Sequence, residues 1–119
     1  MALLYGRILE YMEKNAPFLE EDFSLPQMAT DLYSNRVYLS KTINMMSGRN
    51  FCQFINWYRV THAKEMMRKD PHLKVLEVAT MSGFHSVVSF NQAFKMYEGT
   101  TPSVWLQSIK LEKGVTAED

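Results

Sequence analysis

Apolar residues recur at steps of three and four along most of the chain, which is the spacing of one face of an α-helix. The longest such stretch runs from Phe51 to Lys69. Gly48 closes the helix before it, and Asp70-Pro71 ends it, because the residue before a proline is driven out of the α region. No useful length of chain alternates apolar and polar residues with period two. The pattern therefore predicts an all-α fold.

Capping signals divide the chain into about seven helices. Ser24, Asn35, Ser86 and Thr101 are residues whose side chains cap helix starts well, and Pro102 follows the last of them at the first helical position. The expected helices cover residues 2–15, 24–33, 36–47, 51–69, 75–81, 87–97 and 102–110. We expect the polar tail after Lys110 to fray.

Two stretches on either side of the long helix carry the same motif. Each is a short helix, a tight turn and a second helix with a capped start, which is the arrangement of a helix-turn-helix. The first turn is one residue shorter and lacks the glycine that the second has at position 83. Matched positions lie 51 residues apart, or 50 for the first pair: Ala29/Ala79, Asn35/Ser86, Leu39/Phe90, Ile43/Phe94 and Gly48/Gly99.

The repeat predicts a domain organisation for residues 1–119. The first helix-turn-helix subdomain covers about 1–50, the linker helix about 51–69, and the second subdomain about 72–110. A helix of this length spans roughly 30 Å, close to the separation of about 34 Å between successive major grooves on one side of B-DNA. The linker helix is therefore long enough to place the two motifs in adjacent major grooves.

Helical periodicity also assigns buried faces. The apolar side of 36–47 is expected to hold Val37 or Tyr38, with Leu39, Ile43 and Met46. Apolar positions expected in the later helices are Leu76, Val88 and Val104. For Val37 and Val88 a position on an exposed, DNA-reading face is an equal alternative. Cys52, the one cysteine, is expected to be a small buried hydrophobe.

Composition excludes several classes of protein. The chain is 46% hydrophobic, too apolar for disorder, and no apolar run reaches the roughly 18 residues of a membrane span. One cysteine allows no internal disulfide, and no secretory signal is visible, so we expect a cytoplasmic protein. No nucleophile–base–acid set, phosphate loop or metal-ligand spacing appears. We therefore expect no enzyme activity, no cofactor and no metal.

The charge is unevenly distributed. The formal net charge is zero, but residues 34–110 carry a net +6, against −4 for residues 1–33 and −2 for residues 111–119. The part of the chain that holds the repeat is therefore the basic part, which is compatible with a polyanionic partner.

The motif residues resemble a known family. GFHSVVSFNQAFKMYEGTTPSVW is similar to the second-motif signature of the AraC/XylS-type transcriptional regulators, and NRVYLSKTINMMSGRNFCQFINWYRVTHAKEMM is similar to that family's first recognition helix and linker. The similarity covers about residues 4–108. It implies a seven-helix DNA-binding domain with two helix-turn-helix motifs. Gln92 stands where an arginine is common, and Ile43-Asn44 where Phe-Lys is usual.

Recognition helices contact base edges through their N-terminal half and exposed face. Arg36 and Lys41 are suited to guanine, Asn91 and Gln92 to adenine, and Val87 or Val88 to a thymine methyl. Ser86 and the helix N-termini are candidates for phosphate contacts. The residues expected at the DNA are Arg36, Val37, Ser40, Lys41, Asn44, Ser86, Val87, Val88, Asn91, Gln92 and Lys95.

Together these features predict a sequence-specific DNA-binding domain of a transcription regulator, which reads an asymmetric site in two adjacent major grooves. The expected partners are double-stranded DNA, RNA polymerase and a sensing, dimerising or receiver domain in a larger protein, with no membrane. The alternative is a helical module that kept the fold but binds protein. The zero net charge and the missing basic residues favour that alternative slightly.

Overall fold

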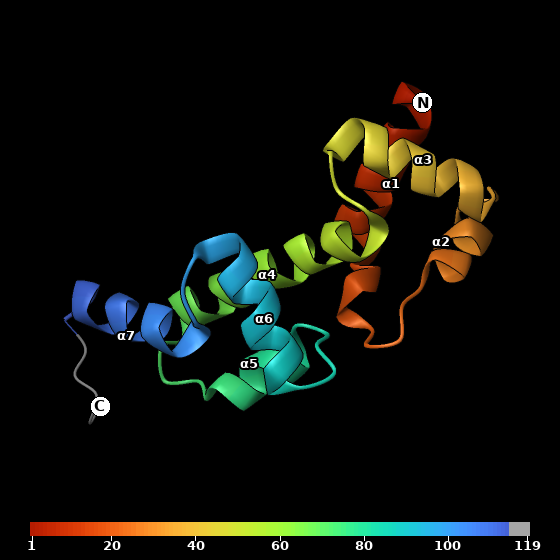
Figure 1. Ribbon diagram of the computed structural model, residues 1–119. Coiled ribbons are helices and arrows are strands. Elements are labelled where there is room, and N and C mark those ends of the chain that lie inside the picture. Colours follow the sequence, from red (N-terminus) through yellow and green to blue (C-terminus); the bar gives the residue numbers. More distant parts are fainter. Residues whose placement is uncertain (115–119) are drawn as a thin grey trace. The chain divides into compact units, whose positions relative to one another are not determined.

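The computed structural model describes residues 1–114, and this part of the chain is helical with no strand (Figure 1). The all-α prediction is confirmed. Seven α-helices and one short 3₁₀-helix follow each other in this order: α1 (Ala2–Asn15), η1 (Pro17–Leu19), α2 (Leu25–Asp31), α3 (Arg36–Ser47), α4 (Phe51–Lys69), α5 (Val75–Met81), α6 (Val87–Glu98) and α7 (Pro102–Glu112).

Helix ends lie where the capping residues place them. The Asn35 side chain accepts a hydrogen bond of 2.8 Å from the Tyr38 N–H at the start of α3. Gly48 ends α3 in the left-handed conformation, with φ of 73°. Ser86 caps α6 in the same way, and Gly99 ends it at φ of 76°. Each cap satisfies a backbone group that has no partner inside its helix, so sequence chemistry fixes both recognition helices at both ends.

Three boundaries differ from the expectation. The turn η1 was not predicted, and α2 ends at Asp31 rather than near Tyr33. Helix α7 continues to Glu112 instead of ending at Lys110. The remainder of the expected frayed tail, residues 115–119, lies outside the described residues.

The chain divides into two compact units, residues 1–56 and the part from Trp57 onward, and α4 contributes to both. In the first unit α3 contacts both α1 and α2, and in the second α6 contacts both α5 and α7. The buried apolar residues of the first unit are Leu4, Ile8, Met12, Phe18, Met28, Ala29, Leu32, Leu39, Ile43, Phe54 and Ile55. The second core holds Val60, Ala63, Met67, Val78, Ala79, Phe84, Phe90, Ala93, Phe94 and Leu106.

The internal repeat extends beyond the two helix-turn-helix motifs. Ile8 and Met12 of α1 are fully buried, and so are Ala63 and Met67, which stand 55 residues later in the second half of α4. The first half of α4 corresponds in turn to α7, since both follow side-chain caps at matching positions, Asn50 and Thr101. Each unit is thus built from four helical segments, and α4 supplies the last of one and the first of the other.

Backbone hydrogen bonds repeat in the two turns. The Ser34 N–H donates to the Ala29 carbonyl at 2.9 Å, and the Phe84 N–H donates to the Ala79 carbonyl at 3.0 Å. Both turns need one residue in the left-handed region. The second turn uses Gly83 at φ of 88°, whereas the first uses Tyr33 at φ of 52°. A side chain in that region crowds the carbonyl that follows it, so the first turn holds local strain that the second lacks.

Each turn is also tied to the first helical segment of its unit. In the first unit the Arg7 guanidinium donates to the Leu32 carbonyl at 2.6 Å. In the second unit His62 Nδ1 lies 3.2 Å from the hydroxyl of Ser82, which is buried. Arg7 and His62 stand 55 residues apart, at matching places of the repeat. An arginine in the first unit and a histidine in the second therefore both contact the turn that precedes the recognition helix.

Several expected buried positions are exposed. Val37 and Met46 of α3 face solvent, as does Tyr38, and Thr42 is buried in their place beside Leu39 and Ile43. For Tyr38 and Met46 the expectation of burial was wrong, because α3 carries apolar residues on several sides, and only its contacts with α1 and α2 decide which side is covered. Val37 takes the exposed alternative that the sequence left open. For the same kind of reason the structure exposes Leu76, Val88, Val104 and Cys52.

Relieving the strain at Tyr33 should stabilise the protein. We expect Tyr33→Gly to raise the free energy of unfolding by about 0.5–1 kcal/mol, since glycine adopts positive φ without crowding but loses more chain entropy. Gly83→Ala should lower it by about 1–2 kcal/mol. Gly6→Ala is the control, because this position is helical with open space around it, and we expect a gain of up to about 1 kcal/mol there. Urea denaturation measures all three, and a loss of stability in Tyr33→Gly would contradict the strain.

The burial of His62 beside the turn should make stability depend on pH. Burial of the imidazole lowers the pKa of His62 below its ordinary value, with Lys69 adding to the shift and Glu65 opposing it. The native state therefore binds the proton less well than the unfolded chain does, so stability is fully present above about pH 6.5 and is lost as pH falls below it. We expect His62→Gln to reduce this loss and the exposed His72→Gln to leave it unchanged. Denaturation curves at pH 5 and pH 7 test this. An equal pH effect in both variants would show that His62 is not the source of the pH dependence.

Candidate nucleic-acid interface

The packing of α3 leaves one face of this helix free. Leu39, Thr42 and Ile43 are buried, so the opposite side of the helix faces solvent. On that side Arg36 and Asn44 are exposed, and Ser40 between them is half-buried. These three residues stand four apart and therefore form one stripe along the helix. The helix that the sequence identified as the first reader thus presents polar side chains outward over its whole length.

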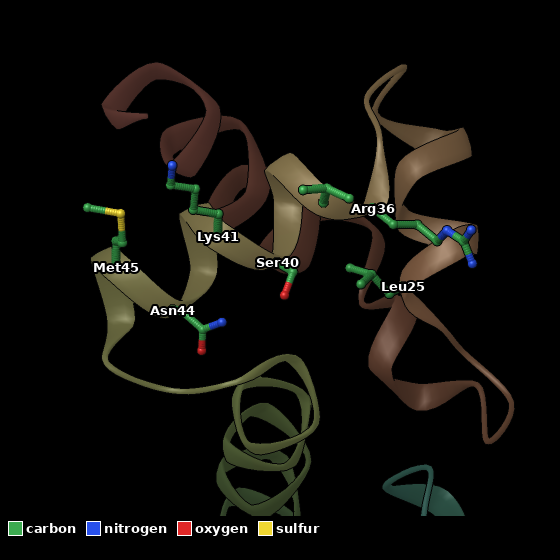
Figure 2. A pocket seen from close by; sticks show the side chains of 7 residues that line it. Leu25, Arg36, Ser40, Lys41, Asn44 and Met45 are labelled. Atoms are coloured by element: carbon green, nitrogen blue, oxygen red, sulfur yellow. The ribbon is translucent and has the colours of Figure 1, made fainter.

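This face borders a shallow open depression of about 660 Å³. Ser40 and Asn44 project from the same side of α3 in Figure 2, and Leu25 reaches the site from α2. The residues lining it are Leu25, Arg36, Val37, Ser40, Lys41, Asn44 and Met45. The structure therefore brings together all five residues proposed from the sequence for the first motif. It adds Leu25 and Met45, which sequence reasoning missed.

The two missed residues, Met45 and Leu25, differ in whether the sequence indicates their place at the site. Met45 stands in the expected helix, four residues after Lys41, so helical spacing alone places it near the reading face. Leu25 lies outside the recognition helix, and only the packing of α2 beside α3 brings it to the site. Helical periodicity in the sequence could therefore have identified Met45 as a site residue, but it could not have identified Leu25.

The positive charges of the first motif are available for a ligand. Arg36 and Lys41 are both exposed, and neither forms a salt bridge with another residue in the range 1–114. Their charges lie next to the apolar surface of Val37 and Leu25 in the same depression. Such a mixture of cationic and apolar groups suits the edges of DNA bases and the phosphates beside them.

The second motif presents a more neutral face. Helix α6 buries Phe90, Ala93 and Phe94. On its other side Val88, Gln92 and Lys95 are exposed, and Asn91 is half-buried. The exposed groups on this side are thus one amide, one lysine, one valine and Met96, with a second amide partly accessible.

Two further candidates at the start of α6 have structural contacts. Val87 packs against the second core, so Val88 is the valine of this pair that stands on the outer face. The Ser86 hydroxyl accepts a hydrogen bond of 3.1 Å from the Ser89 N–H and caps the helix. The other N–H groups of this helix start point outward along the axis, where they favour an anion.

Residues 1–114 contain no group of three or more His, Cys, Asp or Glu side chains placed to hold a metal ion. Over the same range no helix has the length and apolar character needed to cross a bilayer.

Comparison with known proteins also identifies a helix-turn-helix domain in this chain. A family model described as "Helix-turn-helix domain" matches residues 28–108. An uncharacterized HTH-type transcriptional regulator of Staphylococcus aureus strain COL is 29% identical over 98 residues, which is 82% of this chain. The match covers 12% of that protein, so the chain spans a small part of the length of this relative.

Solved structures share the fold. The C-terminal domain of AraT, a response regulator from Geobacillus stearothermophilus, is similar with a TM-score of 0.76 and 27% identity, over 87% of this chain and 83% of that one. The DNA-binding domain of AdpA, described as a global transcriptional factor and solved in complex with a target DNA, gives a TM-score of 0.77 at 19% identity, covering 92% of this chain and 95% of that one. At this identity the second likeness concerns the fold alone.

Proposed function

The chain belongs to the AraC-type helix-turn-helix family of DNA-binding transcription regulators, and from this premise we propose that α3 and α6 are its two DNA-reading helices. The observation that supports the assignment most directly is the repeat itself. Two helices with matching caps each follow a turn with the same hydrogen-bond pattern, and each leaves one face uncovered.

We propose that the two helices enter adjacent major grooves. Helix α4 has 19 residues, which corresponds to about 28 Å at a rise of 1.5 Å per residue. This length suits the separation of about 34 Å between successive major grooves on one side of the duplex. The two reading faces carry different side chains, so the target would be an asymmetric site with two unlike half-sites, read in one direction by one chain.

The side chains suggest how the work is divided. In the first motif, Arg36 and Lys41 would donate to guanine O6 and N7, with Asn44 near the backbone. In the second, Asn91 and Gln92 would pair with adenine N6 and N7. Lys95 and the N–H groups at the start of α6, capped by Ser86, would contact phosphate.

We further propose that the chain acts as the output domain of a larger regulator. The support is that the S. aureus relative is far longer than the matched region. The rest of such a protein would supply sensing, dimerisation or a receiver function, and RNA polymerase would be the partner through which transcription responds. Binding to protein instead of DNA, with the fold kept, is less well supported, because Arg36, Lys41 and Lys95 are exposed on α3 and α6 and the chain matches a helix-turn-helix family model.

Mobility shift of random duplex DNA at low and raised salt tests the assignment. A DNA-binding domain should shift duplex at low salt and lose affinity as salt rises, because each phosphate contact releases counterions. Absence of any shift at low salt would contradict DNA binding and favour the protein-binding alternative.

Substitutions should separate base readers from phosphate contacts. We expect Arg36→Ala to cost about 1–3 kcal/mol of binding free energy and to relax preference at one or two positions of one half-site. Asn91→Ala should relax preference in the other half-site only. Lys95→Ala should weaken binding to all sequences about equally and reduce the salt slope by about one unit.

Binding to a randomised site at two salt concentrations measures all three effects. Lys14→Ala is a matched control, because Lys14 is exposed on α1, outside both recognition helices, and pairs with Glu10. If Arg36→Ala and Lys95→Ala gave the same uniform loss without a change in preference, Arg36 would be a phosphate contact. The register assigned to α3 would then be wrong.

A further inference from the structure

The second residue of each recognition helix is an exposed valine. Val37 of α3 and Val88 of α6 stand 51 residues apart, at the same place in the repeat. They expose 78% and 66% of their surface. An apolar side chain left in water contributes little to folding. The fold therefore does not account for a branched apolar residue at the outer start of both helices.

The surroundings of the two valines differ. Val37 shares the open depression of the first unit with Leu25 and Met45, and this gives the depression an apolar wall beside two cations. The residue that corresponds to Leu25 in the second unit is Val75, which packs against the second core. The first motif thus offers an apolar surface made by two helices, whereas Val88 stands on α6 without that neighbour.

The major groove of DNA exposes one apolar group on its base edges, the 5-methyl group of thymine. The N-terminal residues of a recognition helix are those that come nearest to base edges. Arg36 and Lys41, which we propose as the guanine readers of the first motif, line the same depression as Val37. Val37 would therefore meet a base edge in the same groove as the bases that the two cations read.

We propose that Val37 and Val88 each read the 5-methyl group of one thymine, and that Leu25 widens the methyl contact in the first motif. The proposal rests on the proposed function and specifies its ligand further, because each half-site would then contain one thymine chosen by its methyl group. These valines would be specificity-determining residues, in addition to the polar readers on the same helices.

Uracil differs from thymine only by lacking this methyl group, so the contact can be removed from the DNA without changing the protein. The probe is the tightest duplex recovered by this chain from a randomised library. Each thymine is replaced in turn by deoxyuridine, and the dissociation constant is measured. We expect one thymine in each half-site where the replacement weakens binding about fourfold, the effect of burying one methyl group.

Alanine variants assign each methyl group to its valine. Val37→Ala should bind the thymine duplex more weakly and show a smaller loss on uracil replacement in the first half-site, where Leu25 keeps part of the contact. The uracil effect in the second half-site should remain. Val88→Ala should show the reverse. Val104→Ala is the matched control, because Val104 is an exposed valine on α7, outside both recognition helices, and both uracil effects should persist.

The outcomes separate this proposal from the proposed function. Sequence-specific binding that no uracil replacement changes, or a uracil effect that persists in full in both valine variants, would overturn the methyl contact and leave DNA recognition intact. If the library yields no preferred duplex, the proposed function fails and the methyl contact fails with it. Circular dichroism of each variant establishes that the substitution leaves the helices folded.

Discussion

The structure depends on one helix that serves two hydrophobic cores. Phe54 and Ile55 in the first half of α4 are buried in the first unit, whereas Val60, Ala63 and Met67 in its second half belong to the second core. The two sets do not follow one stripe along the helix, because each is fixed by the core of its own unit. Sharing α4 explains why two four-segment units contain seven α-helices rather than eight within residues 1–114. A break in α4 would remove a packed segment from one unit or the other.

Within each unit two kinds of contact fix the turn before the recognition helix. Its backbone follows the same hydrogen-bond pattern in both copies, and a polar side chain from the first helical segment reaches it, Arg7 in one unit and His62 in the other. The recognition helices then begin at side-chain caps and end at glycines. A short helix fixed at both ends and buried along one side has little freedom left. The exposed side can therefore differ between the copies without cost to the fold, which is how one architecture comes to carry two different reading faces.

The elements were largely predictable from the sequence, and the surfaces were only partly so. Asn35 and Gly48 mark the ends of α3 because caps act on backbone groups a few residues away, and such local chemistry is visible in a sequence. Such local chemistry does not determine which side of α3 faces solvent. Val37, Tyr38 and Met46 are apolar but exposed, since burial depends on which helices pack against α3. Leu25 joins the site from another helix, and no spacing within 36–47 indicates it.

The central claim is that a single chain reads two unlike half-sites in adjacent major grooves. Hydroxyl-radical footprinting of the isolated chain on its preferred duplex, at one chain per duplex, tests it most directly. The account predicts two protected blocks on one face of the DNA, about 10 base pairs apart, with different sequences in the two blocks. A single protected block at that ratio, or a second block that appears only when a second chain binds a symmetric site, would contradict the account.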